Sequence, residues 1–200
     1  MITEEQKKKF HMPCMNNGNE LIFAARANDL EAVKYLMNTE FEYFSRVEGY
    51  KKQQALILAA NDGHLDIVKY LLDDDFKTDI DIKRTCSEAL RSAIREGSVN
   101  SVEFLLTDAK TKDYTYLDCM YCFKLAPKHM LEYLVFEYKM EISPYIERIK
   151  SDSYLMMDRS KKYVPEILNN YEKFIQAKEM HDSLQNELDN GKDNTKKIKI

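Results

Sequence analysis

Cysteines and histidines are the residues of this chain best suited to bind a metal or act as nucleophiles, and there are four of each. Cys119 and Cys122 form a Cys-x-x-Cys pair, and His11 and Cys14 form a His-x-x-Cys pair. A structural zinc site needs four ligands, commonly from two such pairs at a suitable spacing. A single pair on an apolar helix more often packs in a core, because a free cysteine behaves as a small hydrophobe. We therefore expect core packing at Cys119 and Cys122, with a metal or thiol site as the minor alternative.

Catalytic residues cannot be singled out by their spacing. No Ser/His/Asp or Cys/His combination stands out, and the many carboxylates resemble ordinary surface charge. The five glycines are too far apart to form either G-x-G-x-x-G or G-x-x-x-x-G-K. We therefore expect no enzymatic activity and no cofactor.

Composition indicates which classes of partner and which cellular compartment to expect. A net charge of −4 differs from the basic balance of most nucleic-acid-binding proteins. The start, MITEEQKKKF, is polar and lacks the apolar stretch of a signal peptide. The longest apolar run, ALILAA, is too short to cross a bilayer. We expect a cytoplasmic protein with reduced cysteines that binds neither nucleic acid nor membrane.

One segment of the chain occurs three times, with a spacing of 35 and then 34 residues. Leu21, Leu56 and Leu90 hold equivalent positions near the start of the copies. A period of this size is typical of stacked supersecondary units. The copies are ELIFAARANDLEAVKYLM (20–37), ALILAANDGHLDIVKYLL (55–72) and ALRSAIREGSVNSVEFLL (89–106).

Each copy is interrupted near its centre, at Asn28, Gly63 and Gly97. A helix that ends in the left-handed conformation favours Gly, or failing that Asn, because other residues suffer a Cβ clash. The pattern predicts two antiparallel helices joined by a tight turn in each unit. His64 follows one turn residue, and we expect its side chain to bond to the backbone at the head of the second helix rather than to act in catalysis.

At these residues the chain resembles the ankyrin repeat family, most closely over AANDGHLDIVKYLL, residues 59–72. The resemblance implies an all-α solenoid of about four helix-turn-helix units, within a range of about three to five. The T-P-L-H opening of the family is replaced, for example by QALI over residues 54–57, and the Gly-Ala-Asp of its projecting hairpins is absent. We therefore expect irregular or partly helical connectors over residues 38–54 and 73–88.

The first helix of each copy carries small residues where neighbouring units must approach closely, at the equivalent positions Ala24, Ala59 and Ala93, with adjacent pairs in the first two copies. Outside the three copies the pattern weakens. Residues 117–138 suggest a shortened fourth unit, with Cys122 at this small-residue position and Pro127 in the turn. A long helix is expected from Val164 to Leu188, with one apolar stripe that caps the open end of the stack. The stripe consists of Ile167, Leu168, Tyr171, Phe174, Ile175, Leu184 and Leu188. The predicted divisions are an N-terminal cap (1–19), the repeats (20–142), a C-terminal helical cap (143–188) and a flexible tail (189–200).

A solenoid of helix pairs offers a broad curved surface without a deep dry pocket, and its natural use is to bind another macromolecule. The ankyrin resemblance implies that this partner is a protein. In that family the inner face uses the residues before each turn and the tips of the connectors. On this chain the former are Arg26, Ala27, Asn61, Asp62, Arg95 and Glu96, and the latter are Tyr43, Phe44, Tyr50, Lys51, Phe76 and Arg84.

Two clusters in the connectors have both a structural and a functional interpretation. The rings of Phe41, Tyr43, Phe44 and Tyr50 either fold back as extra core or form a contact surface, since interface hot spots favour aromatic residues. The acidic run 73–75 follows a helix end, where the helix dipole prefers cations. We expect this run to be solvated, with a metal or basic partner as the minor alternative.

Three hypotheses describe the specific role of such a module. By analogy, a small ankyrin protein with this skewed composition suits a pathogen- or phage-encoded inhibitor or effector of a host protein. The first rival is a self-assembling module that forms a homodimer through the helix over 164–188, although Lys178 and Gln185 interrupt its stripe. The second rival is the metal or thiol site at Cys119 and Cys122.

Overall fold

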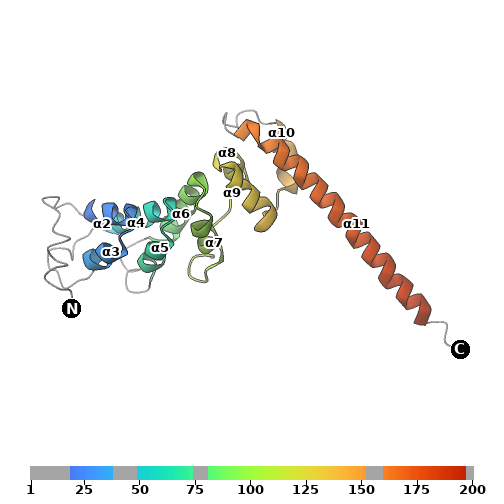
Figure 1. The fold of residues 1–200 in the computed structure, drawn as a ribbon, viewed down its shortest axis with the longest axis horizontal. Coiled ribbons are helices and arrows are strands. Elements are labelled where there is room, and N and C mark those ends of the chain that lie inside the picture. Colours follow the sequence, from blue (N-terminus) through green and yellow to red (C-terminus); the bar gives the residue numbers. More distant parts are fainter. Residues whose placement is uncertain (1–18, 38–48, 74–80, 152–159, 197–200) are drawn as a thin grey trace.

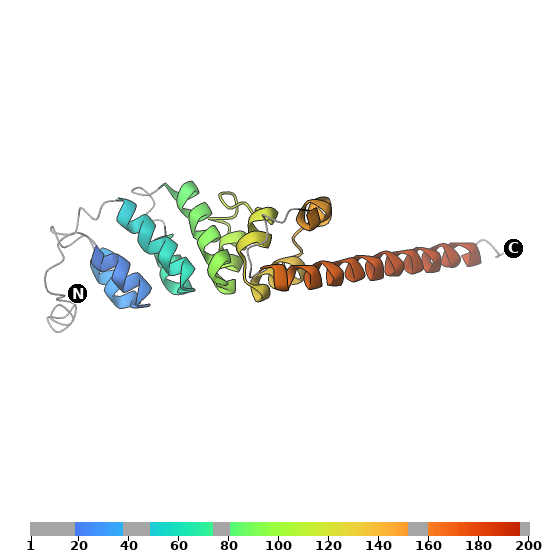
Figure 2. The same cartoon turned by 90° about the horizontal axis from the view of Figure 1, so that it is seen from above.

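The computed structural model describes residues 19–37, 49–73, 81–151 and 160–196, and these contain helices and turns but no strand. The helices lie side by side along one axis and form an elongated stack, as Figure 1 shows. The last helix projects away from the end of this stack (Figure 2). The prediction of an all-α fold is confirmed for the described residues.

Three units each consist of two consecutive helices, as the repeated segment predicts. The first helices of neighbouring units pack directly on one another, and the second helices form a parallel layer (Figure 1). The pairs are α2 (Asn19–Arg26) with α3 (Leu30–Met37), α4 (Gly49–Asn61) with α5 (Leu65–Leu71), and α6 (Ile82–Glu96) with α7 (Val99–Thr107).

The turn inside each of these units contains one residue in the left-handed conformation. The φ angles are 58° at Asn28, 79° at Gly63 and 88° at Gly97. The next residue then donates its backbone N–H to a carbonyl of the first helix, as Ser98 does to Ala93 at 2.9 Å. Such a bond closes a helix C-terminus and satisfies a carbonyl that has no partner within the helix. The predicted turn geometry is confirmed at all three positions.

Small residues allow the first helices to pack closely. Leu21, Leu56 and Leu90 occupy equivalent positions and are at most 1% exposed. They join one core that runs the length of the stack. Alanine fits between neighbouring helices because its side chain keeps their backbones close and it is the best helix former. The alanines at these contacts that are fully buried are Ala25, Ala55, Ala59, Ala60, Ala89 and Ala93.

Two of the first helices begin more than one helical turn before the repeated segment does. α4 begins at Gly49, and α6 begins at Ile82 behind the N-cap residue Asp81. The connectors are therefore partly helical, as expected, while residues 38–48 and 74–80 lie outside the described part. Three residues predicted at connector tips are instead in the first turns of α4 and α6, namely Tyr50, Lys51 and Arg84.

A fourth, less regular pair follows, α8 (Cys119–Leu125) with α9 (Lys128–Glu132). Its turn is built differently, because Ala126 and Pro127 are both extended, with ψ angles of 139° and 161°. α9 continues directly into a π-helical turn. The short elements that follow are the π-helix η2 (Tyr133–Glu137), the 3-10 helix η3 (Ser143–Tyr145), α10 (Ile146–Ser151) and the 3-10 helix η4 (Ser160–Lys162).

The final helix, α11 (Val164–Lys196), covers the end of the stack only with its first turns. Tyr171 is 5% exposed, and its hydroxyl lies 2.9 Å from Ser143 Oγ. The other buried residues of α11 are Val164, Ile167 and Leu168.

Beyond these turns the prediction for α11 is wrong in two respects. Leu184 and Leu188 do not continue a buried stripe but are 53% and 60% exposed, because the helix runs past the end of the stack (Figure 2). Phe174 is 46% exposed but still contacts the Phe136 ring edge-on. The helix also continues to Lys196 rather than giving way to a tail at residue 189. No helix in the described part of the chain is both long and apolar enough to cross a membrane.

Candidate functional site

The residues just before each turn lie at the C-terminal ends of the first helices and form one row along the stack. Arg26, Asn61 and Arg95 occupy the same position in the first three units. Lys124 holds that position in the fourth unit, two residues after the buried Cys122. We call these four residues, with the residue that follows each of them, the turn row. The following residues are Ala27, Asp62, Glu96 and Leu125.

Polar side chains of the turn row bond to one another across three units. Arg26 Nε lies 3.6 Å from Asp62 Oδ2, and Asn61 Nδ2 donates to Asp62 Oδ1 at 2.7 Å. Asn61 Oδ1 in turn accepts a hydrogen bond from the Ser92 hydroxyl at 2.7 Å. Arg95 Nε lies 3.4 Å from Glu96 Oε1 within the third unit. The structure thus brings these predicted residues together, with opposite charges paired.

Side chains that follow the turns connect each unit to the one before it. His64 Nε2 donates to the Arg26 carbonyl at 3.0 Å, and Ser98 Oγ donates to the Asn61 carbonyl at 2.6 Å. His129 Nε2 also bonds to the preceding unit, but to the carbonyl of the turn residue Gly97, at 3.1 Å, rather than to that of Arg95. The prediction that His64 bonds at the head of its own second helix is wrong. Carbonyls at a helix C-terminus lack partners within the helix, so the imidazole N–H stabilises the preceding unit instead.

The remaining predicted residues lie at the other ends of the first helices. Tyr50 is 48% exposed, and Lys51 Nζ lies 4.9 Å from its ring centroid. Arg84 Nε pairs with Glu88 Oε1 at 2.8 Å, and the hydrogen bond to Glu88 raises the pKa of Arg84. Lys51 precedes Asn61 by ten residues of helix, which corresponds to about 15 Å. The predicted residues therefore fall into two groups, and Tyr43, Phe44 and Phe76 lie outside the described residues.

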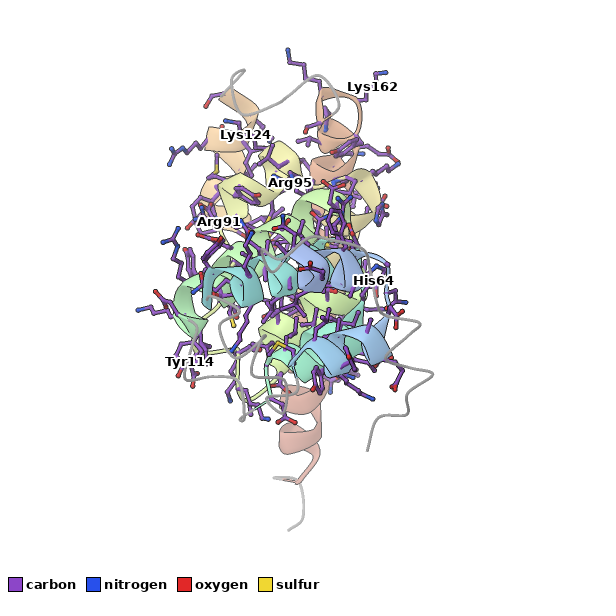
Figure 3. The ribbon with its side chains drawn as sticks, turned by 90° about the vertical axis from the view of Figure 1, so that its left-hand side faces the viewer. His64, Arg91, Arg95, Tyr114, Lys124 and Lys162 are labelled. Carbon is purple, nitrogen blue, oxygen red and sulfur yellow. The ribbon has the colours of Figure 1, made fainter. Side chains whose placement is uncertain are left out.

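A cavity of about 910 Å³ opens where the turn row meets the C-terminal cap. Arg95, Lys124 and Lys162 all line it, and the three are labelled in the upper part of the view in Figure 3. Lys128 also lines the cavity and pairs with Glu166 at 2.8 Å, which raises the pKa of the lysine. The full lining consists of Arg95, Glu96, Lys124, Leu125, Ala126, Pro127, Lys128, Ser160, Lys162 and Tyr163.

Of the ten lining residues, the sequence-based prediction includes only Arg95 and Glu96, and it lacks the two exposed lysines, Lys124 and Lys162. Lys124 could have been found, because aligning Cys122 with Ala93 places Lys124 at the position of Arg95. Lys162 could not have been found in this way, since η4 follows α8 by more than thirty residues and only the fold brings the two together.

Residues 21–118 match the family model for ankyrin repeats, in three copies. These residues belong to the ankyrin repeat family. Ankyrin repeats in general are non-enzymatic modules that bind other proteins. No curated protein and no solved structure matches the chain significantly. The match ends before α8, so the fourth pair and the cap lie beyond the matched ankyrin units.

Cys119 and Cys122 lie in the core beside the last matched ankyrin unit. They are 7% and 0% exposed, as their packing interpretation predicts. Burial raises the pKa of Cys119 to about 12 and raises that of Cys122 further, so both thiols are protonated at neutral pH. Metal ligation requires thiolates, and among the described residues no group of three or more His, Cys, Asp or Glu residues could hold a metal ion.

The acidic run after α5 is described only at its first residue. Asp73 is exposed and pairs with Lys110 of the next ankyrin unit at 3.2 Å. The pair connects the ends of two neighbouring units, and Asp74 and Asp75 lie outside the described residues.

Proposed function

We propose that this ankyrin protein binds a partner protein through the turn row. The observation that carries the proposal is the network of polar side chains along this row, which spans three units. The turns beneath it are fixed by side-chain hydrogen bonds to carbonyls of the preceding unit. An ordered surface loses little side-chain entropy on binding, so more of its contact energy is available for affinity. Arg26 and Arg95 keep more than half of their side-chain surface exposed, and arginine is enriched at protein interfaces.

The charged pair between the first two units allows a test that spares the fold. Exchanging the two charges, in the double variant Arg26→Asp and Asp62→Arg, retains an ion pair but reverses the charge pattern offered to a partner. A matched control exchanges Glu31 and Lys34, which pair at 3.1 Å on the second-helix layer. Circular dichroism and thermal melting check that both variants fold as the wild type does.

Capture of partner proteins from lysates, quantified by mass spectrometry, is the measurement. We expect the turn-row exchange to reduce the captured partner at least about tenfold, while the Glu31/Lys34 exchange changes it less than about twofold. Unchanged capture by a folded turn-row variant would exclude this face. We further propose, from composition and by analogy, that the partner is a host protein and that this ankyrin protein inhibits it in a cytoplasmic compartment.

Self-association is a second candidate function, favoured by the projecting part of α11. Met180, Leu184 and Leu188 are each more than half exposed on a helix that no other described element covers there (Figure 2). Light scattering of wild type and a Leu184→Glu, Leu188→Glu variant tests it, because neither residue contributes to the buried contacts of the cap. A dimeric wild type and a monomeric variant would support it, whereas a monomeric wild type at high concentration would exclude it.

A further inference from the structure

The cavity between the third unit, the fourth pair and η4 concentrates positive charge on a chain whose net charge is −4. Four cationic side chains line it, against one carboxylate, that of Glu96. Within the described residues, Lys124 and Lys162 are exposed and have no ion-pair partner, whereas Lys128 is neutralised by Glu166. The cavity therefore presents two lysines whose positive charge is not compensated, Lys124 on α8 and Lys162 on η4.

The charge continues along the exposed side of α6. Arg91 and Arg95 are one helical turn apart, and like charges at this spacing destabilise a helix by a few tenths of a kcal/mol. The Arg91 guanidinium lies 5.5 Å from the ring centroid of Tyr121, whose hydroxyl donates to the Arg91 carbonyl at 3.0 Å. This contact fixes Arg91 beside α8, below Arg95 in Figure 3. Arg91 is held by the Tyr121 ring and Arg95 by Glu96, yet both side chains are exposed, so the two guanidinium groups extend the positive surface beside the cavity.

The wall of the cavity is apolar and held in place. Leu125, Ala126 and Pro127 form part of the lining. Ser160 Oγ donates to the Lys124 carbonyl at 3.1 Å, and the Tyr163 hydroxyl donates to the Ala126 carbonyl. These bonds attach the cap segment to the extended turn of the fourth unit. The result is a preformed cleft with an apolar wall and a cationic rim.

We propose that this cleft binds an acidic segment of the partner protein, with carboxylates at Lys124, Lys162 and Arg95 and an apolar side chain against Leu125 and Pro127. The proposal rests on the proposed function, because Arg95 and Lys124 belong to the turn row. Charge-assisted bonds between ammonium or guanidinium groups and carboxylates are stronger than neutral ones.

A nucleic acid fits the same charges less well. Its phosphates repeat along the strand and need a continuous basic track. Here Glu96 lines the cleft itself, and Glu132 and Glu166 lie around Lys128. These carboxylates would repel a long polyanion but can be avoided by a short peptide with a few acidic side chains.

Fluorescence anisotropy of labelled peptides with the full chain tests the proposal. The probe is a short peptide that alternates glutamate with leucine, and its control alternates glutamine with leucine. The variant is Lys124→Glu with Lys162→Glu. The matched control is Lys112→Glu with Lys173→Glu, which makes the same change of net charge at exposed lysines away from the cleft.

We expect the Kd of the glutamate peptide to rise at least about tenfold in the cleft variant and less than about twofold in the control variant. Added salt should weaken binding of the glutamate peptide, and the glutamine peptide should bind at least about tenfold more weakly. Equal binding of the two peptides, an equal loss in both variants, or tighter binding of a single-stranded oligonucleotide would each overturn the proposal.

The turn-row exchange at Arg26 and Asp62 separates failure of this inference from failure of the proposed function. If that exchange abolishes capture of the partner while the glutamate peptide does not bind, the cleft proposal alone is wrong. If the exchange leaves capture unchanged and the peptide does not bind, both proposals are wrong.

Discussion

The turn of the fourth unit differs from the three turns before it, and the difference coincides with the cleft. In the first three units a single residue of positive φ reverses the chain within a tight turn. In the fourth unit, two residues with extended backbone, Ala126 and Pro127, connect the helices. Ser160 of η4 donates to the Lys124 carbonyl in the last turn of α8. Tyr163 donates to the carbonyl of the extended Ala126, and the cavity lies between these segments. Regular turns thus build the stack, and an irregular one creates a concave site on it.

A side chain nevertheless bonds back to the preceding unit in both regions. His64 and Ser98 bond to the equivalent carbonyls of Arg26 and Asn61, and His129 bonds to the Gly97 carbonyl, two residues beyond the equivalent Arg95. The fourth pair therefore keeps a side-chain bond to the third unit while changing both its own turn and the carbonyl it uses. We infer that the side-chain bond between units and the turn conformation are independent requirements.

Gly97→Ala should lower the free energy of unfolding by about 3 kcal/mol, through left-handed strain together with overpacking. A Cβ at Gly97 would lie 2.5 Å from His129 Nε2 and 2.9 Å from Pro127 Cγ. Gly63→Ala should cost only about 1 kcal/mol, because there the nearest side-chain atom, Ser98 Oγ, is 3.4 Å away. Urea denaturation measures both. Equal losses of unfolding free energy in the two variants would show that His129 and Pro127 of the fourth pair do not pack tightly against the turn at Gly97.

Cys86 and Cys119 should each lower the free energy of unfolding by about 2 kcal/mol between pH 9 and pH 11. Burial raises the pKa of Cys86 to about 11 and that of Cys119 to about 12. The unfolded chain therefore loses these protons first, and its ionisation favours unfolding as the pH rises above the unfolded pKa. Thermal melts of wild type and of single Cys86→Ala and Cys119→Ala variants measure the effect. A melting temperature that depends on pH as steeply in the variants as in the wild type would contradict it.

Ser98→Ala and His129→Ala should each cost about 1 kcal/mol, because each removes a side-chain hydrogen bond to a carbonyl of the preceding unit. Ser98→Thr is the conservative control, since it retains the hydroxyl. Urea denaturation should give similar losses for the two alanine variants. A large loss at Ser98 with none at His129 would mean that the fourth pair is not held to the stack by such a bond.

Arg26→Ala should change the free energy of unfolding by less than about 0.5 kcal/mol. The pair with Asp62 spans 3.6 Å, and the arginine side chain is 59% exposed, so water screens the attraction. The Ala variant should nevertheless lose partner capture if the turn row is the binding face. A stability loss above about 1 kcal/mol would instead assign Arg26 a structural role.

Local chemistry made several features predictable from the sequence. Asn28, Gly63 and Gly97 indicate left-handed turns because few residues tolerate that backbone conformation. The adjacent small residues indicate close helix packing, and the Cys119/Cys122 pair without suitable further ligands indicates core packing. Each of these inferences needs only the properties of a residue and its near neighbours in the chain.

The errors arose where a partner comes from a distant part of the chain. The hydrogen-bond partner of His64 is a carbonyl 38 residues earlier, which no local pattern specifies. The stripe on α11 has helical spacing throughout, yet only its first turns meet the stack. Amphipathic spacing shows that a face can be buried, but the length of the neighbouring elements decides whether it is.

The sequence by itself determined the repeat, the turns and the ankyrin core, because each depends on residue type at a short, regular spacing. Only the tertiary structure decided which charges are paired, where α11 leaves the stack, and that Lys124 and Lys162 line one cleft with Arg95. The physical reason is that charge compensation and burial depend on distances in space. Those distances are set by the packing of whole units rather than by their order along the chain.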